Sequence, residues 1–374
     1  MIIFYILFVL CSVYVAFLLF ILAGTFYTIS KNIPVKKKYF ISVIIAARNE
    51  EKHLVGLLDA LIQQDYPKDL YEIIVINDRS EDQTDNILNN YSSKYSQIKY
   101  YKIEDVIPEF VGKKRALTEG IRVAKGDVLL FTDADCRPRP GWMRAMNDAF
   151  WYRYDVIVGY SPLLTTKTSF GKKIVHLLKK LERLAMFTFS AGSIGWNWGI
   201  TATGRNFAYR KSVFKDMEGF EGIGFIPSGD DDLFLQKISR TKKYRLGFIS
   251  SKESIVPSIE DKTSSECFHQ EKRRGSKFRF YPLSIKLISF MTFIFLVFLV
   301  FAFVLCLIGL VPWKYFLVPF LIKSCADLLL LLRGAVLFKE FLILLLFPFV
   351  EVLYAPYFIV FGLLGSLSGY RWKQ

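Results

Sequence analysis

The chain has 374 residues, with 49 Lys and Arg against 34 Asp and Glu, so its formal net charge is +15, and 52% of its residues are hydrophobic. This composition excludes a disordered chain, a collagen-like fibre and a small disulfide scaffold, and a mean hydropathy of +0.30 is too apolar for an ordinary soluble basic protein. The charge alone suits an anionic partner such as nucleic acid, a nucleotide or a lipid surface. The two features together are compatible with a membrane protein that has a basic cytosolic part.

Residues 1–29 carry no charged side chain. This length exceeds the roughly 20 residues that cross a bilayer core. The basic residues Lys31, Lys36, Lys37 and Lys38 follow the apolar run, whereas a cleaved signal peptide has its basic residues in front. We therefore expect residues 1–29 to be an uncleaved N-terminal transmembrane anchor with its basic end on the cytosolic side.

Residues 39–281 alternate between short β-branched runs and amphipathic stretches. Strands are predicted at residues 41–45, 71–76, 98–103 and 127–131, and helices at residues 50–64 and 113–124, with Ser80 as the cap of the helix after the second strand. This alternation predicts an α/β domain with a doubly wound, mostly parallel sheet that helices cover on both faces. Ligands of such sheets bind at the carboxyl ends of the strands.

Residues 285–374 are again strongly apolar. About three membrane segments are predicted, at residues 287–313, 315–332 and 341–368, the last interrupted by Pro348, Glu351 and Pro356. These prolines leave two alternatives open, a kinked helix and a re-entrant segment. Within the second segment Lys323 and Asp327 stand four residues apart on one helix, so we expect them to pair.

The approach to these segments is basic. It contains Lys272, Arg273, Arg274, Lys277, Arg279 and Lys286, with only Glu271 opposing them. Basic residues beside membrane spans favour the cytosolic side, and attraction to anionic lipid alone would explain this run. The chain is therefore predicted to be a multi-pass protein of the cell (plasma) membrane, with residues 39–281 in the cytosol.

Asp133 and Asp135 form an Asp-x-Asp pair directly after the apolar strand at residues 127–131. Two carboxylates one residue apart can share a hard divalent cation that keeps open positions for substrate phosphates. A bare pair of this kind is more often a solvated acidic turn. Its position after a buried strand favours a Mg²⁺ or Mn²⁺ site here.

Other polar residues flank the predicted strands. Asn49 and Glu50 close the first strand, Asp78 follows the second, and Lys113 belongs to a basic run at residues 112–115. A carboxylate at such a position can accept hydrogen bonds from a nucleotide, and the basic run suits phosphate. The structural alternatives are an Asx turn or helix cap for Asp78 and a solvent-exposed basic helix start for residues 112–115.

Three consecutive carboxylates occur at Asp230, Asp231 and Asp232. Their mutual repulsion can raise the pKa of at least one of them, which suits a general base acting on a sugar hydroxyl. The alternative is a helix whose dipole favours acidic residues in its first turn.

Taken together and in this order, the motifs of residues 41–274 resemble those of the family 2 glycosyltransferases, which have the GT-A fold. The resemblance implies that a nucleotide-sugar donor is bound by Asn49, Glu50, Asp78, Lys113, Asp133 and Asp135, with the metal at Asp135 supported by Asp133. It also implies that Gly204, Arg205 and Asn206 line the donor and acceptor pocket. A departure is Arg79, which stands where the family's Asp-Asp-Gly-Ser motif has Gly.

The resemblance places the catalytic base at Asp230, with Asp231 as a substitute and Gly229 where the family's motif has Glu. Gln270, Arg273 and Arg274 are similar to the family's Gln-x-x-Arg-Trp motif, with Arg274 in place of Trp. That Trp normally helps to form the acceptor platform, so its absence weakens the case for processive polymer synthesis.

These motifs imply an inverting transfer from a nucleotide-diphosphate sugar, and a UDP-sugar is expected. Residues 172–184 have the pattern of a basic amphipathic helix at a membrane surface, which favours a lipid or lipid-linked acceptor. Two alternatives are a processive polysaccharide synthase with the same active site and a non-catalytic membrane scaffold that retains the fold. Nucleic-acid binding is not indicated, because no recognised motif is present and the basic runs lie beside membrane segments.

Overall fold

A computed structural model of the chain describes residues 2–30, 34–103, 111–164, 170–259 and 277–367. The chain forms two compact units. The first comprises Met1–Phe26, Thr168–Gly192 and Asp261–Gln374, and the second comprises Tyr27–Lys167 and Ser193–Glu260. Each unit has a hydrophobic core of its own.

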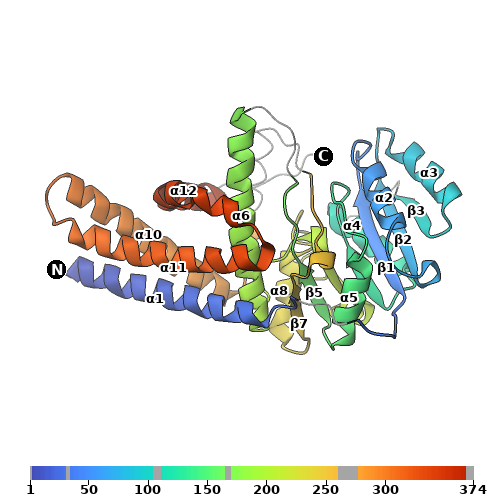
Figure 1. Cartoon of the computed structure of the whole chain (residues 1–374), viewed down its shortest axis with the longest axis horizontal. Helices are drawn as coiled ribbons and strands as arrows, with labels where there is room; N and C mark the ends of the chain where they lie inside the picture. Colours follow the sequence, from blue (N-terminus) through green and yellow to red (C-terminus); the bar gives the residue numbers. More distant parts are fainter. Residues whose placement is uncertain (1, 31–33, 104–110, 165–169, 260–276, 368–374) are drawn as a thin grey trace. The chain divides into compact units, whose positions relative to one another are not determined.

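The second unit is built on a seven-stranded sheet with the order β3-β2-β1-β4-β6-β5-β7. Its strands are β1 (Ile41–Ala47), β2 (Tyr71–Asp78), β3 (Ile98–Ile103), β4 (Val128–Phe131), β5 (Val156–Gly159), β6 (Phe207–Arg210) and β7 (Leu246–Ile249). Neighbouring strands are parallel except at β6, which runs antiparallel to β4 and β5. The sheet is therefore mixed but mostly parallel (Figure 1).

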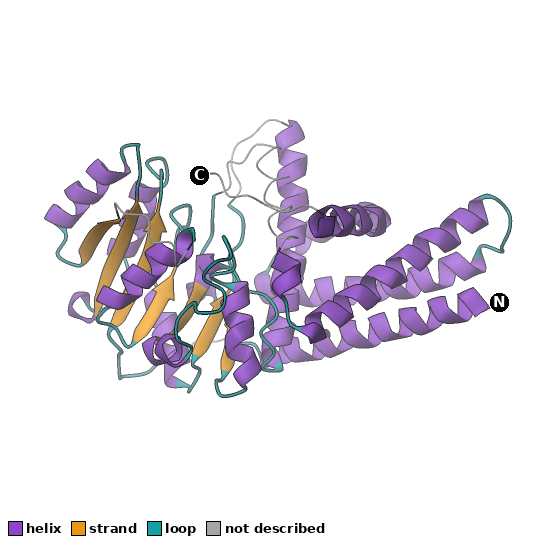
Figure 2. Ribbon diagram, turned by 180° about the vertical axis from the view of Figure 1, so that it is seen from behind, coloured by secondary structure: helices purple, strands orange, loops and turns teal. Residues whose placement is uncertain are grey.

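Helices cover both faces of this sheet (Figure 2). They are α2 (Leu54–Ile62), α3 (Thr84–Lys94), α4 (Lys113–Val123), α5 (Trp142–Trp151), α7 (Lys211–Asp216) and α8 (Asp232–Thr241). On one face, Val43 and Ile45 of β1 share a core with α2 and α5. On the other face α4 approaches β1 closely, because a Cβ at Gly120 would lie 2.6 Å from Cγ2 of Ile44. The predicted doubly wound, mostly parallel α/β architecture is confirmed.

Three strands, β5 (Val156–Gly159), β6 (Phe207–Arg210) and β7 (Leu246–Ile249), are not among the strands predicted from the sequence. Two local predictions are wrong. The helix expected from residue 50 begins at Leu54, after a turn that starts with φ +56° at Asn49. Ser80 does not cap a helix: α3 begins at Thr84, and the Ser80 Oγ instead accepts a hydrogen bond of 3.0 Å from the backbone N–H of Asn49.

The first unit is helical. It contains α1 (Ile2–Gly24), most of α6 (Phe170–Gly195), α10 (Leu283–Leu307), α11 (Lys314–Phe338) and α12 (Phe347–Leu367). Helix α1 packs along both α10 and α11 (Figure 1). In the part of the chain that the structure describes, four segments are long and apolar enough to cross a membrane: Phe4–Tyr27, Leu283–Leu307, Lys314–Phe338 and Phe341–Val360. Helix α12 continues through Pro356.

A polar layer joins three helices of the first unit. Lys323 Nζ lies 2.6 Å from Asp327 Oδ2, which confirms the expected pair, and 2.6 Å from Glu351 Oε1, which adds a partner on α12. The Tyr14 hydroxyl of α1 donates to Asp327 Oδ1 over 2.7 Å, and Ser324 Oγ donates to Glu351 Oε1 over 2.8 Å. These groups therefore meet hydrogen-bonding partners inside an otherwise apolar core.

Candidate active site

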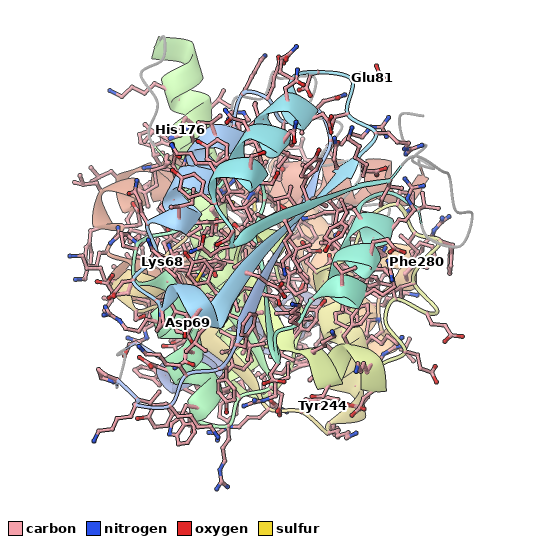
Figure 3. All side chains as sticks on the ribbon, turned by 90° about the vertical axis from the view of Figure 1, so that its right-hand side faces the viewer. Lys68, Asp69, Glu81, His176, Tyr244 and Phe280 are labelled. Carbon is pink, nitrogen blue, oxygen red and sulfur yellow. The ribbon has the colours of Figure 1, made fainter. Side chains whose placement is uncertain are left out.

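Polar residues from several elements meet at one edge of the sheet. The parallel strands β1, β2 and β4 end there. Because β6 is antiparallel, the turn that precedes it, residues 204–206, reaches the same edge. Figure 3 labels Glu81, which follows β2 at this edge, and Lys68 and Asp69, which precede β2 and lie away from it. The start of α8 adds Asp230 and Asp231.

Lys113, the first residue of α4, links the Asp-x-Asp pair to the acidic run. Its Nζ donates a hydrogen bond to Asp133 Oδ1 and lies 3.6 Å from Asp230 Oδ2. Gly204 allows this approach: a Cβ there would lie 3.1 Å from the Lys113 Nζ and 3.5 Å from Asp230 Oδ2. The structure thus brings together four of the residues that the motifs single out.

Arg205 provides a second cation beside the Asp-x-Asp pair. Its Nε lies 3.9 Å from Asp135 Oδ2 and 4.0 Å from Asp133 Oδ2, and its side chain is only 12% exposed. A guanidinium in this position can pair with the two carboxylates and can also donate hydrogen bonds to a diphosphate bound beside them.

The charges of the site shift the ionisation of several of its members. Burial acts to raise the pKa of Asp133, but the nearby Lys113 and Arg205 outweigh it and hold this pKa below its ordinary range. Burial acts to lower the pKa of Lys113, but Asp133 and Asp230 outweigh it and raise this pKa. The pKa of Glu50 rises to about 7, first because of burial and then because of Asp135 and Asp133. The Glu50 carboxyl therefore keeps its proton to a higher pH than an ordinary glutamate does.

The two candidate bases differ in their contacts. Asp231 is the N-cap of α8: its Oδ1 accepts from the backbone N–H of Asp232 at 2.7 Å, and its Oδ2 accepts from the backbone N–H of Gly204 at 3.0 Å. Asp230 instead directs Oδ2 toward Lys113. The position in the first turn of a helix, expected as the alternative for the acidic run, belongs to Asp232, whereas Asp231 caps this helix and Asp230 faces Lys113.

Asp78 is held by two arginines. Its Oδ1 lies 2.5 Å from Arg115 Nη2 and 3.0 Å from Arg79 Nε. Arg115 and Lys114 are buried, so neither fits the expected phosphate-binding run or a solvent-exposed helix start. Lys113 is the member of this run whose ammonium lies among the site carboxylates. The Asp78–Arg115 pair is not predicted from the sequence, because it depends on the packing of α4 against β2.

Two predicted site residues are engaged in holding loops. Asn49 Oδ1 accepts a hydrogen bond of 2.8 Å from the backbone N–H of Glu81, so it ties the loops after β1 and β2 together. Asn206 is fully buried. The Oδ1 of Asn206 accepts a hydrogen bond of 3.0 Å from Trp142 Nε1, and the Nδ2 of Asn206 donates to the carbonyls of Tyr160 and Ser254. Both amides therefore hold together loops that contribute residues to the site.

Gln270, Arg273 and Arg274, predicted to bind the acceptor, lie outside the described residues. Among the residues that the structure does describe, no group of three or more His, Cys, Asp or Glu side chains is arranged to hold a metal ion. Asp133 and Asp135 still fit Mg²⁺ or Mn²⁺, because such ions are commonly bound by one or two carboxylates and complete their shell with water and substrate phosphates.

Comparisons with known proteins agree with the resemblance that the sequence motifs indicate. Residues 42–218 match Glycosyl transferase family 2. The probable glycosyltransferase YdaM of Bacillus subtilis (strain 168) is 32% identical over 218 residues, which are 54% of this chain and 50% of YdaM. A beta-monoglucosyldiacylglycerol synthase of Trichormus variabilis is 31% identical over 98 residues, 26% of this chain and 20% of that protein. The chain thus spans half or less of the length of these curated relatives.

A solved structure shares the fold over nearly the whole chain. The mannosyltransferase PcManGT from Pyrobaculum calidifontis, in complex with GDP-Man and Mn²⁺, superposes with a TM-score of 0.55. The two sequences are 15% identical, and the superposition covers 97% of this chain and 96% of that one. The α/β unit therefore has the GT-A fold.

Proposed function

We propose that the chain is a membrane-bound family 2 glycosyltransferase. It transfers a sugar with inversion from a nucleotide-diphosphate sugar, expected to be UDP-linked, to a hydroxyl of a lipid or lipid-linked acceptor at the cytosolic face of the membrane. The observation that carries this proposal is the position of Lys113, whose ammonium joins Asp133 of the Asp-x-Asp pair to Asp230. The family match over residues 42–218 and the shared fold support it.

On the donor side, Asp78, Glu50 and Asn49 lie on the loops that would surround the nucleotide. Mg²⁺ or Mn²⁺ held by Asp135 and Asp133 would neutralise charge that develops on the departing diphosphate. Lys113 and Arg205 add fixed positive charge at the same place. These cations bind and orient the diphosphate without needing to reorganise during the reaction.

On the acceptor side, Asp230 takes the proton from the attacking hydroxyl, which displaces the nucleotide diphosphate from the opposite face of the sugar. Asp231 fixes the start of α8 and the Gly204 turn, so it orients this base. A single displacement needs no covalent enzyme intermediate. Gly204, Arg205, Gln270, Arg273 and Arg274 complete the proposed acceptor and product side.

A lipid acceptor is supported by three observations. Four described segments are long and apolar enough to cross a membrane. Helix α6 combines basic residues with exposed apolar side chains at Ile174, Val175 and Leu178. The Trichormus relative is named for a glycolipid product. An interfacial helix of this composition brings the chain to the plane in which lipid hydroxyls lie.

The test uses the purified full chain with a panel of nucleotide sugars, with Mg²⁺ or Mn²⁺, and with a membrane lipid extract as acceptor. We expect sugar to be transferred to lipid, and Asp135→Ala and Asp230→Ala to abolish transfer. Asp65→Asn is the matched control, because this carboxylate is 61% exposed and pairs with Arg144 away from the site. Transfer that survives both site substitutions would defeat the assignment, and polymeric products would favour a processive synthase.

A further inference from the structure

The loop that delivers Asp230 is flexible in composition. Residues 217–229 precede Asp230 in the segment that joins α7 to α8, and they include glycines with positive φ at Gly219, Gly222 and Gly229. Glycine adopts such conformations without steric cost, but it adds conformational freedom that must be lost for the loop to become fixed. The last residue of this loop immediately precedes the proposed base. Contacts to the residues just before Asp230, in addition to those of Asp231, therefore contribute to the position of this base.

Lys114 makes such contacts with the loop before Asp230. Its side chain is 1% exposed, and its Nζ donates hydrogen bonds of 2.7 Å to the carbonyl oxygens of both Ile226 and Ser228. A buried ammonium requires such partners, and hydrogen bonds from a charged donor are stronger than neutral ones. Ser228 lies two residues before Asp230, so these bonds fix the chain directly at the approach to the base.

The start of α4 touches the same loop at two more points. The backbone N–H of Val111 donates to the carbonyl of Gly224 over 3.1 Å. A Cβ at Gly112 would lie 3.0 Å from the carbonyl oxygen of Pro227, and Gly112 has φ +68°. The loop is therefore seated against the residues that carry Lys113 and Lys114.

We infer that Lys114 is a positioning residue that holds residues 226–228 so that the Asp230 carboxylate faces Lys113 and the donor site. This inference rests on the proposed function, in which Asp230 is the base. Lys113 and Lys114 have different contacts. Lys113 contacts Asp133 of the donor site, and Lys114 fixes the loop that carries the base. The two adjacent lysines thereby place the base relative to the donor.

Lys237 offers a matched control. Its Nζ donates to the carbonyls of Met217, Gly219 and Glu221, at 2.6, 3.2 and 2.8 Å, so it anchors the opposite end of the same loop. Removing the Lys237 ammonium deletes the same type of contact from the same loop, but at residues 217–221, which are farther from Asp230 in the sequence than Ile226 and Ser228 are. Positioning of the base by Lys114 predicts that the two lysines differ in their effect on catalysis.

The experiment compares Lys114→Met, Lys114→Gln, Lys237→Met and Asp230→Asn in the full chain, with kcat and donor KM for transfer and the Kd of UDP. We expect Lys114→Met to lower kcat by about 10–100-fold, part of the general-base contribution, and to leave donor KM and the UDP Kd within about twofold. Lys114→Gln keeps a donor group and should recover part of kcat. Lys237→Met should keep kcat within about twofold of wild type.

An unchanged kcat in Lys114→Met, or an equal loss in Lys237→Met, would overturn the inference. If Lys114→Met does not fold, Lys114→Gln tests the same contacts with a side chain that keeps a hydrogen-bond donor, and it should lower kcat and leave the UDP Kd unchanged. A wild-type kcat in Asp230→Asn would instead refute the proposed base, whatever Lys114 does.

Discussion

Ionisation of Glu50 costs free energy in the folded protein. Burial and the carboxylates of Asp135 and Asp133 raise its pKa from the ordinary 4.5 to about 7. Between these values the folded chain binds a proton that the unfolded chain has released, so the free energy of unfolding falls as the pH rises through this window. Above pH 7 the full cost is present, and below pH 4.5 it is absent.

Glu50→Gln should therefore stabilise the metal-free protein at pH 8 by about 1–2 kcal/mol, allowing for screening of a partly exposed group, and should change little at pH 4.5. Chemical denaturation of the purified chain at both pH values measures this difference. Glu81→Gln, an exposed carboxylate at the same edge, is the control and should be neutral at both. A stabilisation by Glu50→Gln that is the same at both pH values would contradict the electrostatic explanation.

The Asp78–Arg115 pair is the second residue-scale feature, because both side chains are nearly buried. Arg115→Met removes the closer of two cations and leaves Arg79 at 3.0 Å, so we expect a loss of about 2–3 kcal/mol, below the 3–5 kcal/mol of a fully broken buried pair. Adding Asp78→Asn removes the stranded charge and should restore part of the loss. Equal stability of the single and double variants in chemical denaturation would show that the pair is not coupled.

At the scale of elements, β1, β2 and β4 could be predicted because each contains a run of apolar residues that becomes buried, and β3 because isoleucines and tyrosines dominate it. The Asp-x-Asp pair could be predicted for the same reason, since it follows β4 in the chain. The contacts of Arg205 could not. They depend on β6 lying antiparallel to β4, with Phe207 opposite Phe131, and nothing in either four-residue segment specifies this long-range pairing. The burial of Lys114 likewise depends on a loop more than a hundred residues away.

The polar layer is the element-scale feature of the helical unit. Lys323 of α11 pairs with Asp327 on its own helix and with Glu351 on α12. Lys323→Met leaves both carboxylates without this cation, so the thermal unfolding midpoint of the purified chain should fall by several degrees. The triple variant, in which Asp327→Asn and Glu351→Gln are added to Lys323→Met, removes the unbalanced charge. Its unfolding midpoint should lie between those of Lys323→Met and the wild type. A midpoint unchanged by Lys323→Met would show that the layer does not hold α11 to α12.

At the scale of the whole molecule, the net charge of +15 and the hydrophobic content of 52% belong to different parts of the chain. The apolar residues concentrate in the four candidate spans. At the sheet edge, by contrast, Lys113 and Arg205 are embedded among carboxylates. The positive charge that alone would suit nucleic acid is compatible with the proposed function, in which basic residues lie beside membrane segments and face anionic lipid and a sugar diphosphate.

The central claim is that this edge performs inverting transfer with Asp230 as the base, and the anomeric configuration of the product tests it most directly. The purified full chain is supplied with an α-linked UDP-sugar that it accepts and with a lipid extract, and the new linkage is assigned by NMR. A single displacement predicts a β-linked glycolipid, and Asp230→Asn should abolish its formation. An α-linked product, or a β-linked product formed equally well by Asp230→Asn, would contradict the account.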